Sequence, residues 1–146
     1  MKPIYFYFRF LWFCFFKVNI SAVVDVSGSI DPKSFKRIDN LLRLATNFST
    51  VHVILVDHEI FSCYAYNPLY PLVKNRILGH RAAGGSSIDS AANYVNSIPR
   101  ADGLLIFSDG YVPAPSESPI MDTLWVIAPG GAVLDKSYPG KVLYSN

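Results

Sequence analysis

The stretch NISAVVDVSGSIDP, residues 19–32, contains a strand, a polar loop and the start of a helix. Residues 19–26 are apolar enough for a buried central strand, which ends in the polar loop 27–31. Asp31 followed by Pro32 is typical of a helix start, with Asp31 as the N-cap and proline in the first turn. Strand, loop and helix in this order indicate the repeating unit of an α/β fold.

The rest of the chain continues the alternation of apolar runs and helical patterns. The predicted elements are strands at 51–56, 103–107, 123–128 and 141–144, a helix at 88–98, and a short helix or strand at 73–78. Residues 61–66 are expected to pair back with 51–56 as an antiparallel edge strand. We therefore predict one doubly wound α/β domain over residues 18–146, with a mostly parallel, Rossmann-like sheet.

Residues 1–17 form a hydrophobic leader that precedes this domain. Residues 4–16 read IYFYFRFLWFCFF, with Arg9 near the middle of the run. A spanning helix needs about 20 apolar residues, and a central arginine is costly in a bilayer. An extra strand and a membrane anchor both stay open for this segment. We expect a cytoplasmic protein, with attachment to a membrane through residues 4–16 as the alternative.

Composition excludes some classes of protein. The chain has 146 residues, enough for one ordinary domain, and 51% of them are hydrophobic. A net charge of +2 is too small to indicate a nucleic-acid partner. Cys14 and Cys63 lack the paired spacing of a zinc or redox motif. We expect two buried free thiols, while one disulfide between them stays open for an oxidising compartment.

Three polar loops carry the candidate chemistry. They are residues 25–29 (DVSGS), 84–87 (GGSS) and 108–110 (SDG). Ligands of open α/β sheets bind at the carboxyl ends of the strands, where such loops converge. The loops combine two carboxylates with several hydroxyls, and these hard oxygen ligands suit Mg²⁺, Mn²⁺ or Ca²⁺.

Each loop alone also has an ordinary structural interpretation. Asp25 would cap the following helix, Ser27 and Ser29 would satisfy turn backbone, and Ser-Asp-Gly is a common turn sequence. Their joint occurrence in this order favours a functional site. Two facing carboxylates, Asp25 and Asp109, are also unfavourable unless a cation or a proton lies between them.

The order D-x-S-x-S, Gly-Gly-hydroxyl and S-D-G resembles the metal-ion-dependent adhesion site of von Willebrand factor A domains, from about Val18 to the C-terminus. The strings DVSGSI, GGSSID, DGLLIFSDG, TLWVIAP and PGKVL are similar, more narrowly, to the VWA-like domain at the C-terminus of predicted bacterial and phage metallopeptidases. The peptidase motif H-E-x-x-H does not occur in this sequence.

The resemblance implies a role for each residue of the site. Ser27 and Ser29 would coordinate Mg²⁺ or Mn²⁺ directly, while Asp25 and Asp109 would hold it mostly through bound waters. Ser86 would supply the hydroxyl that is usually threonine, and Ser87 would replace it if the loop is displaced by one residue. One coordination position would stay open for an acidic residue of a partner protein.

The sequence therefore predicts a non-catalytic, metal-dependent protein-binding module. The alternatives are a metal-dependent hydrolase, an accessory subunit or domain of a peptidase or ATPase complex, and a structural module without an ion. Against a serine hydrolase, Asp25 and Ser29 occupy the glycine positions of a G-x-S-x-G elbow around Ser27. The histidines, His52, His58 and His80, are scattered along the chain.

Overall fold

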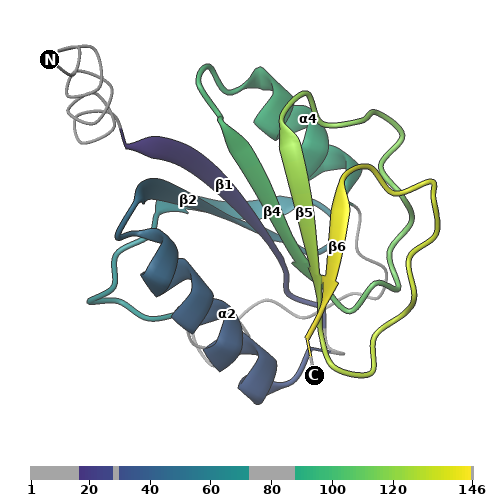
Figure 1. Cartoon of the computed structure of the whole chain (residues 1–146), viewed down its shortest axis with the longest axis horizontal. Helices are drawn as coiled ribbons and strands as arrows, with labels where there is room; N and C mark the ends of the chain where they lie inside the picture. The colour runs from purple at the N-terminus through teal and green to yellow at the C-terminus, as the bar shows by residue number, and fades with distance from the viewer. Residues whose placement is uncertain (1–16, 28–29, 73–87, 146) are drawn as a thin grey trace, which may run out of the picture.

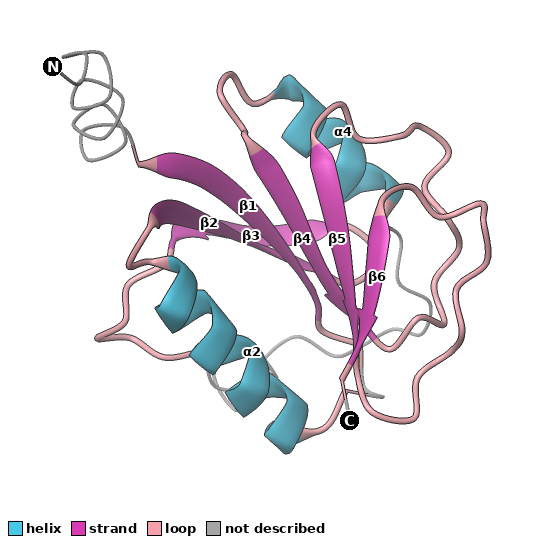
Figure 2. Ribbon diagram, in the orientation of Figure 1, coloured by secondary structure: helices cyan, strands magenta, loops and turns pink. Residues whose placement is uncertain are grey.

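The computed structural model describes residues 17–27, 30–72 and 88–145, which form a six-stranded sheet and two helices (Figures 1 and 2). The strand order in the sheet is β3-β2-β1-β4-β5-β6. The elements are β1 (Val18–Asp25), α2 (Pro32–Ala45), β2 (Ser49–Val56), β3 (Ile60–Ala65), α4 (Asp89–Ser97), β4 (Gly103–Ser108), β5 (Asp122–Ile127) and β6 (Lys141–Tyr144).

Parallel pairing dominates the sheet. Among the described strands, the antiparallel pair is β2 with β3, at one edge, and its register shifts between Leu55 and Val56. The parallel strands β1, β2, β4, β5 and β6 all end at the same edge, called here the carboxyl edge. The prediction of a mostly parallel α/β sheet with one antiparallel edge strand is confirmed.

The two helices cover opposite faces of the sheet (Figure 2). Neighbouring residues of a strand point to opposite faces, so Val24 packs with Phe35 and Leu42 of α2 while Val23 packs on the α4 side. The α4 side also contains Trp125, which is fully buried. The strands β1 and β4 at the centre are therefore buried on both faces, which explains their continuous apolar runs.

The start of α2 follows from its first residues. The side chain of Asp31 accepts a hydrogen bond from Ser34 N at 2.6 Å, and Pro32 occupies the first turn. Hydrogen bonds from the Ser34 backbone and side chain lower the pKa of the Asp31 carboxyl. The predicted N-cap is confirmed, and it fixes where α2 begins at the carboxyl edge.

Two expectations about the cysteines and the leader have different outcomes. Cys63 is a free thiol, but it is exposed, so the prediction of a buried thiol is wrong for this residue. The reason is its place on β3, the edge strand, whose last three residues face solvent.

Cys14, the leader and the predicted element at 73–78 lie outside the described residues. Neither α2 nor α4 has the length and apolarity that crossing a bilayer requires.

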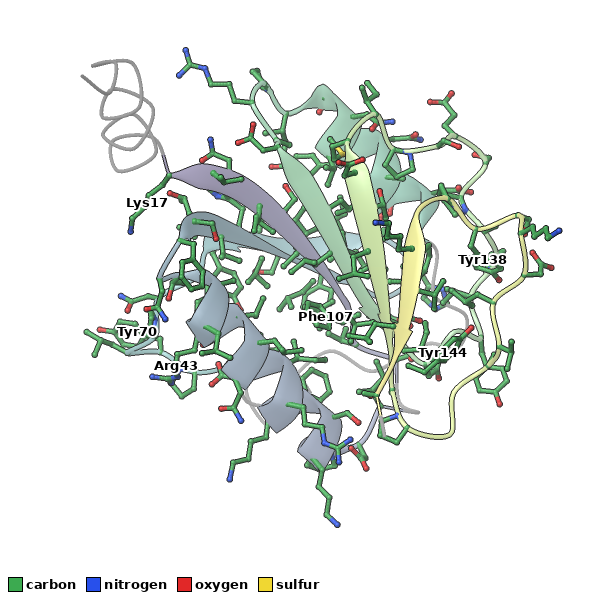
Figure 3. All side chains as sticks on the ribbon, viewed as in Figure 1. Lys17, Arg43, Tyr70, Phe107, Tyr138 and Tyr144 are labelled. Atoms are coloured by element: carbon green, nitrogen blue, oxygen red, sulfur yellow. The ribbon has the colours of Figure 1, made fainter. Side chains whose placement is uncertain are left out.

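A buried carboxylate ties α2 to the chain that follows β3. Asp39 Oδ1 accepts hydrogen bonds from the Tyr66 hydroxyl at 2.6 Å and from Leu72 N at 2.7 Å. The Asp39 Oδ2 lies 3.5 Å from the Arg43 guanidinium. Figure 3 shows Arg43 and Tyr70 at the same end of α2. Because Asp39 and Tyr66 are buried, these bonds fix the segment 66–72 against the helix.

Tyr66→Phe is expected to cost about 1–3 kcal/mol of unfolding free energy at pH 7, because Asp39 loses a buried donor. Burial, and then the hydrogen bond to Asp39, raise the pKa of the Tyr66 phenol in the folded chain. This contribution to stability is therefore complete below about pH 10, the pKa of an unfolded tyrosine, and is lost as the pH rises further.

Urea unfolding at pH 8 and pH 11 checks this expectation. The wild-type chain should lose more stability between the two values than Tyr66→Phe does. Tyr70→Phe, which removes an exposed hydroxyl nearby, serves as the control and should behave like the wild type. Equal alkaline losses in the wild type and Tyr66→Phe would contradict the assignment.

Candidate metal site

Asp25 ends β1 and is fully buried at the carboxyl edge. Its Oδ1 accepts a hydrogen bond from Ser27 N at 2.9 Å, and its Oδ2 accepts one from Ser108 Oγ at 2.9 Å. Two fixed donors thus satisfy both oxygens of a carboxylate that has left bulk water. Val26 N donates to Val56 O at 2.9 Å, which holds the loop after Asp25 against the end of β2.

Ser108 links β1 with the turn that follows β4. Its buried hydroxyl donates to Asp25 and accepts a hydrogen bond from Gly110 N at 3.0 Å. Gly110 has φ +81°, a left-handed conformation that favours glycine. The S-D-G turn therefore depends on its glycine for shape and on Ser108 for its connection to Asp25.

Asp109 lies in the same turn and is buried. Its Oδ1 accepts a hydrogen bond from Tyr111 N at 3.0 Å, and its carbonyl oxygen accepts one from Ala132 N at 2.8 Å. The second bond joins the turn to the loop that follows β5. Asp109 is thus held from two sides, by its own turn and by the neighbouring loop.

A cleft of about 140 Å³ opens beside Asp109. It lies between the start of α2 and the loop after β5, and its lining is Asp31, Ser34, Asp109, Tyr111 and residues 128–131. A Cβ at Gly131 would collide with the carbonyl oxygen of Asp109 and with Ile127. The wall of the cleft at this point is therefore backbone.

The structure places three of the predicted ligands at the carboxyl edge. Asp25 and Ser27 share one hydrogen bond, and Asp109 directly follows Ser108, which is bonded to Asp25. Ser29, Ser86 and Ser87 lie outside the described residues. Within residues 17–27, 30–72 and 88–145, no group of three or more His, Cys, Asp or Glu side chains is arranged to hold a metal ion.

Sequence reasoning missed the position of Ser108 in the site. It belongs to the S-D-G motif, but only the parallel register of β1 and β4, with Val24 opposite Phe107, brings its hydroxyl to Asp25. Asp31, Ser34 and Tyr111 were also not expected beside Asp109. Of the histidines, His52 is an exposed residue of β2, His58 lies in the turn after this strand, and His80 lies outside the described residues.

The donor atoms fit a hard divalent cation. They are carboxylate and hydroxyl oxygens, which suit Mg²⁺ or Mn²⁺ better than soft metals. Both oxygens of Asp25 already accept a hydrogen bond, which suits contact with an ion through bound water. Ser27 is half-buried and Asp109 borders the cleft, so both lie where an ion would be reachable from outside.

No protein-family model and no curated protein sequence matches this chain.

Proposed function

We propose that this chain is a non-catalytic binding module that holds Mg²⁺ or Mn²⁺ at the carboxyl edge and uses the ion to engage an acidic residue of a partner protein. The observation that carries the proposal is that the D-x-S-x-S and S-D-G motifs meet at this edge, through buried residues. Asp25 is fully buried and bonded to Ser108, and the same turn supplies Asp109 beside an open cleft.

Each residue of the predicted set has a part in the proposed site. Ser27 and Ser29 are the direct ligands through their hydroxyls, and Asp25 and Asp109 act mostly through bound water. Ser86, or Ser87 in its place, completes the set from the part of the sequence that precedes α4. Only Asp25, Ser27 and Asp109 lie within the described residues, so the proposal rests on these three.

Electrostatics supports a cation between the two aspartates. Moving carboxylates out of water costs free energy, and placing two of them in one site adds repulsion. A divalent ion offsets both costs. It also leaves a coordination position that a carboxylate of a partner can fill through the cleft beside Asp109, between Ser34 and the backbone of Gly131.

The chain is, in this proposal, a vWA-like domain of the cytoplasm that works as an accessory part of a larger assembly, such as a peptidase or ATPase complex. The association with such assemblies rests on the resemblance of the D-x-S-x-S and S-D-G motifs alone. Fractionation of cells that express the full chain, and chains without residues 1–16, tests the location.

An ion titration tests the function. Isothermal titration calorimetry of the chelator-treated full chain is expected to show one site for Mg²⁺ and for Mn²⁺, and tighter binding of Mn²⁺ follows from the general affinity order of divalent metals. Sodium chloride at matched ionic strength is the control and should give no saturable heat. If neither divalent ion binds with a saturable isotherm, the proposal is wrong.

A further inference from the structure

The side of α2 that points away from the sheet carries cations and no exposed carboxylate. Phe35, Ile38 and Leu42 face the sheet, so residues at helical spacing on the other side of α2 face solvent. Asp39, the acidic residue of this helix, is buried and hydrogen-bonded to Tyr66. The exposed residues on the outer side are Lys33, Lys36, Asn40, Arg43 and Leu44.

The apolar part of this side lies at the C-terminal end of the helix. Leu44 is 58% exposed, and Phe48, in the turn that follows, is 75% exposed. Phe48 N donates to Ala45 O at 3.1 Å, so the turn continues the helix and places Phe48 one turn beyond Leu44. We call the resulting surface the α2 outer face, and it consists of Lys33, Lys36, Arg43, Leu44 and Phe48.

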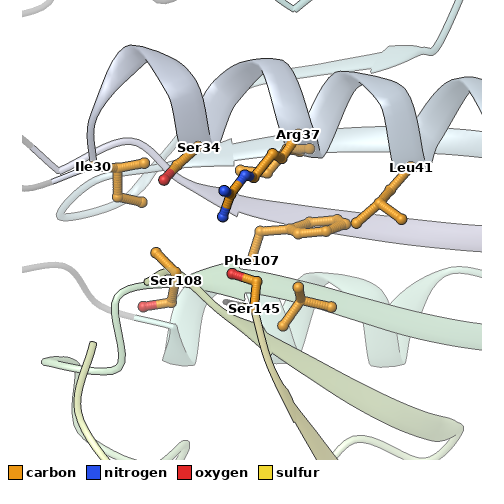
Figure 4. Close-up of a pocket in the computed structure, with 10 residues that line it drawn as sticks. Ile30, Ser34, Arg37, Leu41, Phe107, Ser108 and Ser145 are labelled. Carbon is orange, nitrogen blue, oxygen red and sulfur yellow. The ribbon is translucent and has the colours of Figure 1, made fainter. Parts of the chain in front are cut away.

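One border of the α2 outer face is the flank of the helix above β4. Arg37 and Leu41 lie on this flank, where they line a cavity of about 30 Å³ together with Phe107 and Ser145 (Figure 4). A cavity of this volume holds one or two water molecules. It is therefore too small to receive a large side chain of a protein partner.

Charge is distributed unevenly between the two faces of the sheet. Of the eight lysines and arginines among the described residues, four belong to α2. On the opposite face, α4 contains no lysine or arginine and begins with Asp89. Ser116 N donates to Asp89 Oδ1 at 2.6 Å, which holds the loop with the exposed Glu117 against α4. An anionic surface is therefore attracted to the α2 side and repelled by the α4 side.

We propose that the α2 outer face binds an anionic lipid bilayer, which makes the chain a peripheral membrane protein. Such a bilayer presents a plane of negative charge to Lys33, Lys36 and Arg43, and an apolar layer directly beneath it to Leu44 and Phe48. Each cation near an anionic bilayer strengthens binding about fivefold, so the three together contribute roughly 100-fold. This contact uses none of the residues of the candidate metal site.

Co-sedimentation of the full chain with vesicles tests the proposal. One set of vesicles contains phosphatidylcholine alone, and the other also contains phosphatidylglycerol. Binding to the anionic vesicles is expected to be at least about tenfold tighter than binding to the neutral ones. It should be lost in about 1 M sodium chloride, where charges are screened beyond roughly 3 Å.

Lys33→Glu combined with Lys36→Glu is expected to weaken binding to the anionic vesicles at least about 25-fold. Both residues lie near the start of α2, where acidic side chains suit the helix dipole, so the fold should survive. Arg100→Glu combined with Lys136→Glu is the matched control, because it changes the net charge equally. Arg100 lies just after α4, and Lys136 lies in the loop whose Tyr138 packs on Trp125 on the α4 side. This variant should keep its affinity within about threefold.

Phe48→Ser tests the apolar part of the contact. It is expected to weaken binding about threefold or more and to leave the salt dependence unchanged, because it removes a ring and no charge. Ile120→Ser is the control and should bind like the wild type. Ile120 is also exposed, but its backbone N bonds to Asn96 of α4, on the opposite face.

The comparison also distinguishes other causes of binding. All variants keep residues 1–16, so this apolar part of the sequence cannot cause a difference between them. Equal binding to neutral and anionic vesicles, or equal losses in the two double variants, would overturn the proposal. Absence of binding to anionic vesicles would overturn it too, and binding of a polyglutamate peptide in their place would assign the α2 outer face to an acidic protein.

Discussion

Asp25→Asn is expected to remove most of the stability that Mg²⁺ gives to the wild-type chain. An ion at a hundred times its dissociation constant adds about 2.7 kcal/mol to the free energy of unfolding. For a domain of this size, that gain raises the unfolding temperature by roughly 10 °C. If the substitution weakens binding a hundredfold, the same ion concentration adds only about 0.4 kcal/mol.

The asparagine variant is chosen because it preserves shape. The side-chain amide keeps one oxygen for Ser27 N, and its nitrogen donates to the Ser108 hydroxyl, whose proton turns away. The fold should therefore survive while the charge is lost. Thermal unfolding with Mg²⁺ and with chelator measures the gain for each variant.

Two further variants complete the comparison. Asp109→Asn should also lose the ion-dependent gain, because it removes the second carboxylate of the proposed site. Asp122→Asn, which neutralises an exposed carboxylate at the opposite end of β5, should keep the full gain. An ion-dependent gain in Asp25→Asn as large as in the wild type would mean that the ion binds elsewhere.

Trp125→Ala is expected to cause the largest loss of stability, about 3–5 kcal/mol. Trp125 is fully buried in the core on the α4 side and packs edge to face against Tyr138, with ring centroids 5.3 Å apart. Its indole Nε1 donates to the carbonyl oxygen of Pro139 at 2.9 Å. The substitution therefore leaves a cavity and frees the loop that follows β5.

Trp125→Phe separates the two contributions. Phenylalanine keeps much of the ring volume but leaves the Pro139 carbonyl without the indole donor, at a cost of about 1–3 kcal/mol. Urea unfolding at pH 7 measures both variants, and Leu69→Ala, at an exposed position, should change stability by less than about 0.5 kcal/mol. A loss below about 1.5 kcal/mol for Trp125→Ala would contradict the assigned packing.

Local sequence signals predicted the element order and the sheet well. Asp31 and Pro32 mark the start of α2 because capping depends on neighbouring residues only. The run 61–66 was expected to pair back on 51–56 because the connection is short, and β3 does so. Signals that act over a few residues are readable from one sequence, and such signals determine most of this fold.

The partners of Asp25 were less predictable. Ser27 contributes its backbone N–H to Asp25, as the turn after the strand suggests, but the hydroxyl that bonds Asp25 comes from Ser108. That pairing depends on the register of β1 against β4, which no local pattern encodes. The exposure of Cys63 was mispredicted for a related reason, since its surroundings depend on β3 being the edge of the sheet.

The hydrogen bond between Asp25 and Ser108 joins residues that are 83 positions apart in the chain. Contacts between such distant residues form late, because the entropy of closing the intervening chain must be overcome first. In the proposed function, an ion at this point would therefore find its site only in the nearly complete fold. It would leave the folding rate almost unchanged and slow the unfolding rate, so that it prolongs the life of the native chain without guiding its formation.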